Sequence, residues 1–360
     1  MTNVRDFVFA ILKAAIWKIP VCTPEGFGAE EWGMVHSVMS IHGLTAFAYD
    51  AVTAMPDAMK PPKAVSFRFI SSVIAAEQNY AKLVEADRRL NELICKFGYK
   101  ALRLKGFTLA AYYPKPSSRR FGDIDIYSPD KGDAIDDCFR SKGIEVDDSF
   151  YRHSHCRING IFIENHKCLL DIRGRKRLRE LDRTLKHMAS DILRRETLPA
   201  LYNPDAFFSA IFNLHHSLSH FIYEGVTLKF LTDWILFLKS EREVMNSERM
   251  EEMLQAHGLI KYAGLLTRVS IDHLGLTEEY LPSYLFKAAE SIAPELENKF
   301  IEDMFRPYQE PYYENKVKVR INNIRRIVKS SWKTEEFLGQ SSFSFLCGKA
   351  LPILLGKNKE

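Results

Sequence analysis

The stretch from Leu104 to Ile126, LKGFTLAAYYPKPSSRRFGDIDI, is the most informative part of the chain. It ends in alternating aspartate and isoleucine, and residues two apart in a strand point to the same face of a sheet. Asp123 and Asp125 are therefore expected to project together while Ile124 points into the core. Two neighbouring carboxylates repel each other unless a cation lies between them, and Mg²⁺ takes oxygen ligands together with substrate phosphates. The pair predicts a metal site and a phosphate-bearing substrate, although an isolated D-x-D is also common on exposed strands.

The residues before the aspartates add candidate phosphate contacts. Lys105 and Gly106 stand where a strand is expected to turn into a helix. A glycine there lets a phosphate approach the backbone, and a helix N-terminus offers free amide groups. Arg119 and Arg120 directly precede the aspartate strand, and guanidinium groups bind phosphate through paired hydrogen bonds. Two plainer interpretations stay open: a glycine needed only for the turn, and arginines on a solvated loop.

Hydrophobic spacing gives the surrounding organisation. Apolar residues recur every three or four positions through the first hundred residues and again beyond residue 175, whereas alternation dominates between them. Helices are predicted over 32–52, 65–97, 133–142, 177–190, 204–220 and 228–241, and strands over 99–104, 121–127 and 144–148. Two further strands are joined by Asn159-Gly160, a dipeptide that favours tight hairpins. The prediction is an α+β fold, with a small mixed-sheet core (98–175) between helical regions (1–97 and 176–335) and an apolar tail (336–360).

Composition limits the class of protein. The 360 residues, 46% of them hydrophobic, can bury one large core or two moderate ones. The net charge of +4, from 50 basic and 46 acidic residues, argues against a long nucleic acid as partner. Six dispersed cysteines without a C-x-x-C pair indicate reduced thiols and predict a cytoplasmic protein. The apolar stretch 7–17 contains Lys13 and predicts an amphipathic helix, and 343–356 is too short to cross a bilayer, so no membrane span is expected.

The motif resembles a known family. The LKG turn, a helix with Tyr-Pro near its end, an arginine and then GDIDI are similar to an uncharacterised nucleotidyltransferase family, found in many bacterial genomes, of the DNA polymerase β-like superfamily. The resemblance runs from about residue 41 to about residue 238. It implies that Gly106 grips an NTP triphosphate, that Asp123 and Asp125 hold two Mg²⁺ (or Mn²⁺) ions, and that a carboxylate on a later strand completes the site. One departure is Phe107, which stands where the superfamily usually has glycine or serine.

Two residues compete for the role of third carboxylate. Alternation over residues 161–165 (IFIEN) places Glu164 on one face with His166, and the family's usual carboxylate two positions before a histidine matches this pair. Asp171 has the opposite parity if the strand continues unbroken. Glu164 is therefore preferred, and His166 is expected either to orient it, to contact the nucleotide, or to serve as a structural histidine.

Later helices contribute weaker candidates. Lys229 and Asp233 stand four apart, which suits either nucleotide contact or an ion pair on a helix face, and the resemblance favours nucleotide contact. His216 and His220 have the spacing of metalloprotease zinc ligands, but the glutamate of H-E-x-x-H is missing, so helix packing or cleft lining is the preferred interpretation.

Together these features predict a metal-dependent enzyme that moves an NMP from an NTP to an acceptor hydroxyl. The acceptor is expected to be a small molecule, a protein or a glycan precursor, and the oligomeric state stays open. The alternative is a non-catalytic protein of the same fold that binds a nucleotide or a partner.

Overall fold

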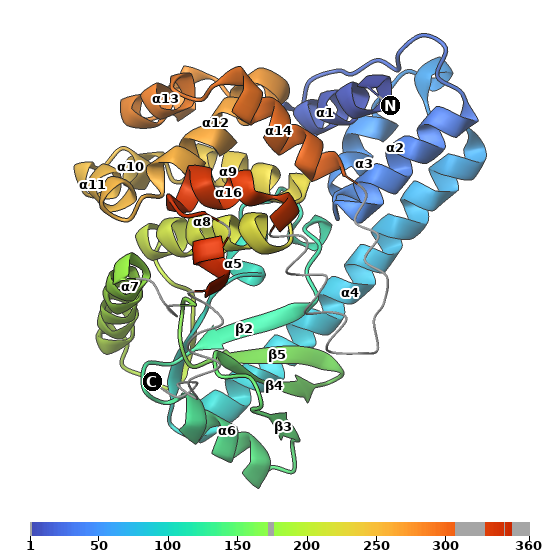
Figure 1. Cartoon of the computed structure of the whole chain (residues 1–360). Coiled ribbons are helices and arrows are strands. Elements are labelled where there is room, and N and C mark those ends of the chain that lie inside the picture. The colour runs from blue at the N-terminus through green and yellow to red at the C-terminus, as the bar shows by residue number, and fades with distance from the viewer. Residues whose placement is uncertain (1, 172–175, 307–327, 342, 348–360) are drawn as a thin grey trace.

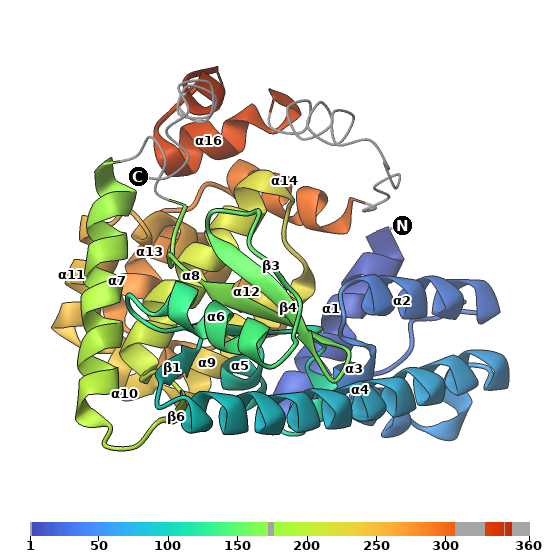
Figure 2. The ribbon, with the colours of Figure 1, turned by 90° about the horizontal axis from the view of Figure 1, so that it is seen from below.

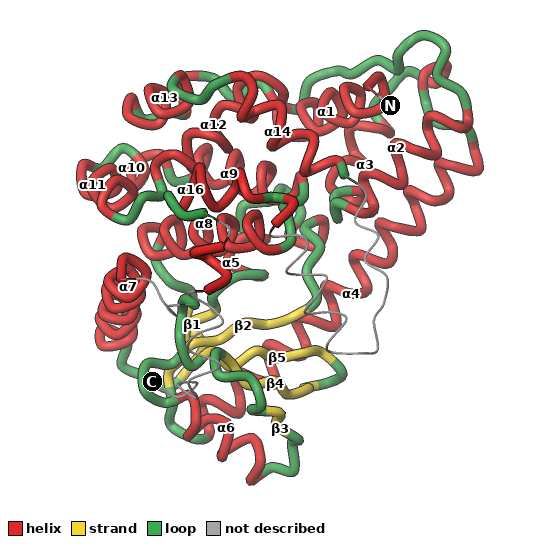
Figure 3. The backbone as a smooth tube through the Cα atoms, viewed as in Figure 1, coloured by secondary structure: helices red, strands yellow, loops and turns green. Residues whose placement is uncertain are grey.

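The computed structural model describes residues 2–171, 176–306, 328–341 and 343–347 (Figure 1). A six-stranded mixed sheet is flanked in sequence by helical regions, and Figure 3 shows its strands gathered below the larger group of helices. The α+β class predicted from the sequence is confirmed.

The N-terminal region is helical, as predicted. Its helices are α1 (Thr2–Trp17), α2 (Ala29–Ile41), α3 (Thr45–Thr53) and α4 (Lys63–Lys96), with the 3₁₀ turn η1 (Asp57–Met59) before α4. The proline-rich segment ends at Pro62, directly before α4, where a missing amide hydrogen costs little. The single helix predicted over 32–52 is instead two helices, because the chain turns at residues 42–44.

The sheet has the strand order β3-β4-β5-β2-β1-β6. Its strands are β1 (Lys100–Arg103), β2 (Asp123–Tyr127), β3 (Val146–Asp147), β4 (His153–Ile158), β5 (Ile161–His166) and β6 (Ala200–Tyr202). Strands β4 and β5 form the predicted hairpin, since Asn159 and Gly160 both adopt positive φ angles, 50° and 80°. Strand β2 pairs in parallel with β5 and antiparallel with β1. Strand β6, which pairs in parallel with β1, lies in a segment for which only helices were predicted.

The two faces of the sheet have different neighbours. Ile124 and Ile126 belong to a core that includes Leu90 and Ile94 of α4 together with Phe139 of α6 (Gly132–Ser141). Helix α4 passes along this side of the strands in both ribbon views (Figures 1 and 2). Alternation therefore directs the aspartates of β2 to the other face, toward the C-terminal helices.

The segment between β1 and β2 holds the short helix α5 (Phe107–Ala110) and the turn η2 (Pro116–Ser118). The C-terminal elements are α7 (Lys176–Arg195), α8 (Ala206–Tyr223), α9 (Leu228–Ser240), α10 (Arg242–Met245), α11 (Glu248–Ala256), α12 (Ile260–Leu274), η3 (Glu278–Tyr280), α13 (Ser283–Glu290), α14 (Pro294–Phe305) and α16 (Ser331–Leu338). No described helix is long and apolar enough to cross a membrane. Most of the predicted apolar tail, residues 348–360, lies outside the described residues.

Candidate active site

Asp125 is the most enclosed carboxylate of the site. It is 3% exposed, and two basic side chains contact the same carboxylate oxygen. Its Oδ1 lies 2.6 Å from Lys105 Nζ and 2.9 Å from His166 Nε2. Burial alone would raise the pKa of the Asp125 carboxyl, but the Lys105 ammonium and the His166 hydrogen bond hold the pKa well below its usual value. Asp125 is therefore ionised at neutral pH.

Asp123 shares the face of Asp125, as alternation predicts, but is more accessible. Burial and the neighbouring Asp125 charge raise the pKa of the Asp123 carboxyl. The Lys105 charge opposes this rise. The two aspartates thus differ in proton affinity although they lie two positions apart in one strand.

Glu164, the residue that the sequence favours as third carboxylate, lies beside Asp125. In the parallel register of β2 and β5 the two residues are direct partners. His166 Nε2 lies between them, 2.9 Å from Asp125 Oδ1 and 3.5 Å from Glu164 Oε2. Burial alone would raise the pKa of Glu164, but the His166 hydrogen bond and Lys105 lower it. The ligand atoms of Asp125, Glu164 and His166 all lie within 4.8 Å of one another, so two carboxylate oxygens and one imidazole nitrogen are close enough to share a divalent ion.

Asp171, the other candidate, occupies a different place. Strand β5 ends at His166, so the parity argument against Asp171 does not apply. Asp171 lies in the wall of a cavity between the sheet and helices α8 and α9. Its Oδ1 accepts a hydrogen bond of 2.5 Å from the Tyr151 hydroxyl. Glu164 is the candidate that shares a potential metal cluster with Asp125, and Asp171 is the one that lines the cavity.

The turn before α5 needs its glycine. Gly106 has φ +57° and ψ −97°, a conformation that residues with a β-carbon rarely adopt. A β-carbon at this position would also come within 2.9 Å of the Phe121 ring. Gly106 lines the cavity together with Lys105. The predicted glycine turn is therefore structurally required, and it faces the cavity.

Arg119 and Asp233 form a buried ion pair. The guanidinium Nε and Nη2 lie 2.8 Å from Oδ1 and Oδ2 of Asp233, and both side chains are almost fully buried. The Tyr113 hydroxyl donates a further bond of 2.8 Å to Asp233 Oδ1. Both charged residues line the cavity, but each neutralises the other. This ion pair thus links α9 to the segment before β2, whereas the sequence suggested that each residue contacts the nucleotide separately.

Lys229 and Arg120 have different surroundings. Lys229 lines the cavity, and its Nζ donates a 3.1 Å bond to the backbone oxygen of Arg120. Burial, with a smaller contribution from the Arg119 charge, lowers the pKa of Lys229 to about 8. The Arg120 side chain is exposed and bonds the backbone oxygen of Ser40 at 3.3 Å. Lys229 is therefore a cation directed at the cavity, and Arg120 is not.

The cavity has a volume of about 920 Å³ and lies between the sheet and helices α8 and α9. Its helical wall includes residues that sequence reasoning missed, above all Asn213, whose side-chain amide atoms are buried with no hydrogen-bond partner among the described residues. No spacing rule identifies a single asparagine of this kind. His216 also lines the wall, and burial lowers its pKa well below the ordinary value, so its imidazole is neutral.

A mixed sheet that presents clustered carboxylates and a glycine turn to a cavity of this size is typical of nucleotidyltransferases. The family model described as "Uncharacterised nucleotidyltransferase" matches residues 28–275, which is more than half of the chain. The chain belongs to this family. The match extends beyond the region of resemblance at both ends, from the start of α2 to the end of α12. No curated protein and no solved structure matches the chain.

Proposed function

We propose that this nucleotidyltransferase moves an NMP from an NTP to an acceptor hydroxyl of a small molecule, a protein or a glycan precursor. The observation that best supports the proposal is the ionised Asp125, held between Lys105 and His166 and next to Asp123 and Glu164. The adjoining cavity is large enough for a nucleotide and part of an acceptor.

In the proposed reaction the acceptor oxygen bonds to the α-phosphorus of the NTP. The bond from that phosphorus to the leaving pyrophosphate breaks, and the acceptor hydroxyl loses its proton. Gly106 lets the triphosphate approach the backbone at the start of α5. Lys229 supplies positive charge from the opposite wall. Glu164 receives the hydroxyl proton in this proposal, which its ionised carboxylate beside Asp125 supports.

Asp123, Asp125 and Glu164 are the residues that would hold Mg²⁺ or Mn²⁺. When bound, such ions neutralise phosphate charge and make a hydroxyl easier to deprotonate. The protein's own contribution is position and charge: Lys105 keeps Asp125 ionised, and the β2–β5 register keeps Glu164 beside it. Catalysis of this kind depends mainly on electrostatic stabilisation.

The test is transfer of label from each α-³²P-labelled NTP to components of an extract of the source cells. We expect label transfer that requires Mg²⁺ or Mn²⁺ and that falls at least about 100-fold in Asp123→Asn. Asp123 is the better position for the test, because substitution of Asp125 would leave buried Lys105 without its counter-charge. Asp57→Asn, an exposed carboxylate of η1, serves as the matched control and is expected to retain full transfer.

Undiminished transfer by Asp123→Asn would overturn the assignment of the site. If an NTP raised the melting temperature but none of the four labelled nucleotides, ATP, GTP, CTP and UTP, transferred its label, the protein would instead be one that binds nucleotide without catalysis.

A further inference from the structure

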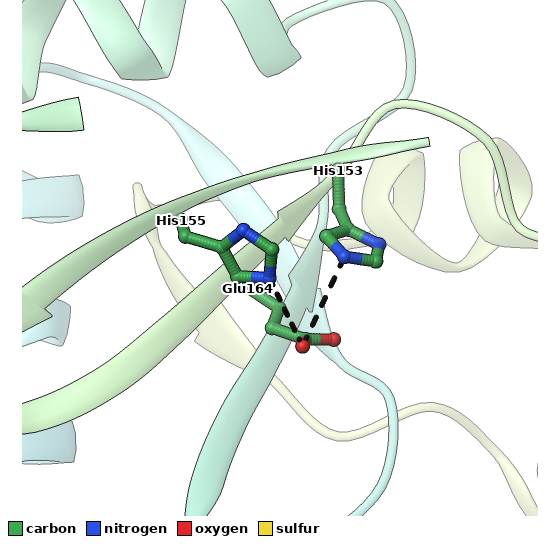
Figure 4. A group of neighbouring side chains, drawn as sticks. All are labelled: His153, His155 and Glu164. Atoms are coloured by element: carbon green, nitrogen blue, oxygen red, sulfur yellow. Dashed lines mark hydrogen bonds and ion pairs between the residues drawn. The ribbon is translucent and has the colours of Figure 1, made fainter. Parts of the chain in front are cut away.

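Two histidines of β4 point toward Glu164 of β5 (Figure 4). His153 and His155 are two residues apart, so they share one face of the sheet, and the antiparallel register places His155 directly opposite Glu164. Their Nε2 atoms lie 3.9 Å and 3.3 Å from the same oxygen, Glu164 Oε1. Three potential ligand atoms from two paired strands therefore surround one point.

The spacing suits a bound ion. Two ligand atoms about 2.1 Å from a tetrahedral Zn²⁺ lie about 3.4 Å apart. The three ligand atoms of this group all lie within 4.8 Å of one another. Small rotations of the side chains would bring them to coordination distance.

The donor types decide which ion fits. Mg²⁺ and Ca²⁺ prefer oxygen ligands throughout, whereas imidazole nitrogen suits Zn²⁺ and its neighbours in the first transition row. Two imidazoles and one carboxylate also leave a fourth position open, as in catalytic zinc sites. We propose that His153, His155 and Glu164 form a binding site for a divalent transition ion of the Zn²⁺ type, next to the Asp123 and Asp125 pair.

The surroundings of the two histidines leave the group open to an ion on one side. Nε2 of His153 is directed at Glu164 Oε1, whereas Nδ1 on the far side of the ring is buried and has no hydrogen-bond partner among the described residues. The Phe150 ring lies 4.8 Å from the His153 ring and limits its movement. The side chains of His155 and Glu164 are 32% and 21% exposed, which leaves a path for an ion.

The site touches the candidate active site through one carboxylate. Glu164 Oε1 faces the histidine pair, and Glu164 Oε2 lies 3.5 Å from His166, which bonds Asp125. Any effect of the ion on nucleotidyl transfer rests on the proposed function. Binding of the ion does not, because it requires neither nucleotide nor turnover.

A second pair of histidines provides the comparison. His216 Nε2 and His220 Nε2 on α8 are 3.0 Å apart, and His220 Nδ1 lies 2.9 Å from Glu224 Oε2. Glu224 thus contacts the outer nitrogen of His220 and not the space between the rings. The β4–β5 group is one of two groups with three suitable ligands in the described part of the chain, and the α8 pair is not among them.

The test is direct measurement of Zn²⁺ binding to the full chain after removal of metals, by competition with a chromophoric chelator, without nucleotide. We expect one ion per chain, and at least about 10–100-fold weaker binding in His153→Ala and in His155→Ala. Co²⁺ in the same site is expected to give visible d–d absorption that both variants lose. His187→Ala, an exposed histidine of α7, is the matched control and should bind as the wild type does.

His155 is the more exposed of the two ligands, so His155→Asn provides a variant with little risk to folding, checked by circular dichroism. Wild-type affinity in His153→Ala and His155→Asn would overturn the proposal, as would loss of the ion in His220→Ala alone. Asp123→Asn is expected to bind Zn²⁺ normally while it loses NTP turnover. If the wild-type chain turned over NTP normally but did not bind Zn²⁺, the zinc site would be overturned and the proposed function would remain.

Discussion

Replacement of Asp233 by alanine is expected to lower the free energy of unfolding by about 3–5 kcal/mol, because it leaves the Arg119 guanidinium buried without its counter-charge. Arg119 is 6% exposed and Asp233 is 7% exposed, so water cannot easily take the place of either partner. The pair also joins α9 to the segment before β2, which forms one wall of the cavity.

The magnitude follows from the contacts. Asp233 accepts two hydrogen bonds of 2.8 Å from Arg119 and one of 2.8 Å from the Tyr113 hydroxyl. Hydrogen bonds to charged groups contribute about 1.5–3 kcal/mol each, so the two guanidinium bonds correspond to about 3–6 kcal/mol, which agrees with the loss of about 3–5 kcal/mol typical of a broken buried ion pair. Arg119 keeps a longer contact of 3.4 Å to the Gly106 oxygen, which relieves a little of the cost.

The assay is urea unfolding of Asp233→Ala, Arg119→Met and the double variant. The double variant is expected to be at least about 1 kcal/mol more stable than Asp233→Ala, because it removes the unpaired charge. Asp50→Ala is the matched control, since it breaks the exposed pair with Lys115 and is expected to cost less than about 1 kcal/mol.

Two results would show that Arg119 and Asp233 do not depend on each other. One is a loss below about 1 kcal/mol in Asp233→Ala, which would mean that water or another group solvates the guanidinium. The other is a double variant whose loss equals the sum of the two single losses, which would show no coupling between the residues.

Two further predictions concern the cavity wall. Gly106→Ala is expected to lower the free energy of unfolding by about 1–3 kcal/mol, because the backbone conformation disfavours a β-carbon and the Phe121 ring occupies its place. A free energy of unfolding within about 0.5 kcal/mol of the wild-type value would contradict this. Lys229 has a pKa of about 8, so NTP affinity measured by calorimetry is expected to fall as the pH rises through 8, and Lys229→Met should flatten that dependence. The unfolded chain holds the Lys229 proton up to about pH 10.5, while the folded chain releases it near pH 8. The free energy of unfolding of the wild type, relative to that of Lys229→Met, should therefore rise between pH 8 and pH 10.5. A difference that stays constant over this range would show that the pKa of Lys229 is not lowered.

Much of the candidate site could be predicted, because it depends on local periodicity. Alternation placed Asp123 with Asp125 on one face, and Asn159-Gly160 identified the β4–β5 hairpin. The same alternation identified Glu164 as a neighbour of the aspartates once β5 paired with β2. The H-x-H pattern of β4 likewise places His153 and His155 on one face, but their position beside Glu164 follows only from the register of the hairpin.

Other features depended on contacts between distant segments. Arg119 and Asp233 are 114 positions apart, and no spacing rule could show that their side chains pair with each other. The short strand β6 has too few residues to give a periodic signal. Asp171 lies in the cavity wall because β5 ends at His166 and does not continue as a strand to residue 171.

The fold class, the position of the glycine turn and the face that carries the carboxylates can thus be predicted from the order of the residues, since they follow from steric rules acting over a few positions. Which charges are free to meet a substrate depends on contacts that form only in the folded chain. Burial and pairing set this: Asp233 neutralises Arg119, Lys105 holds Asp125 ionised, and Lys229 faces the cavity with a lowered pKa.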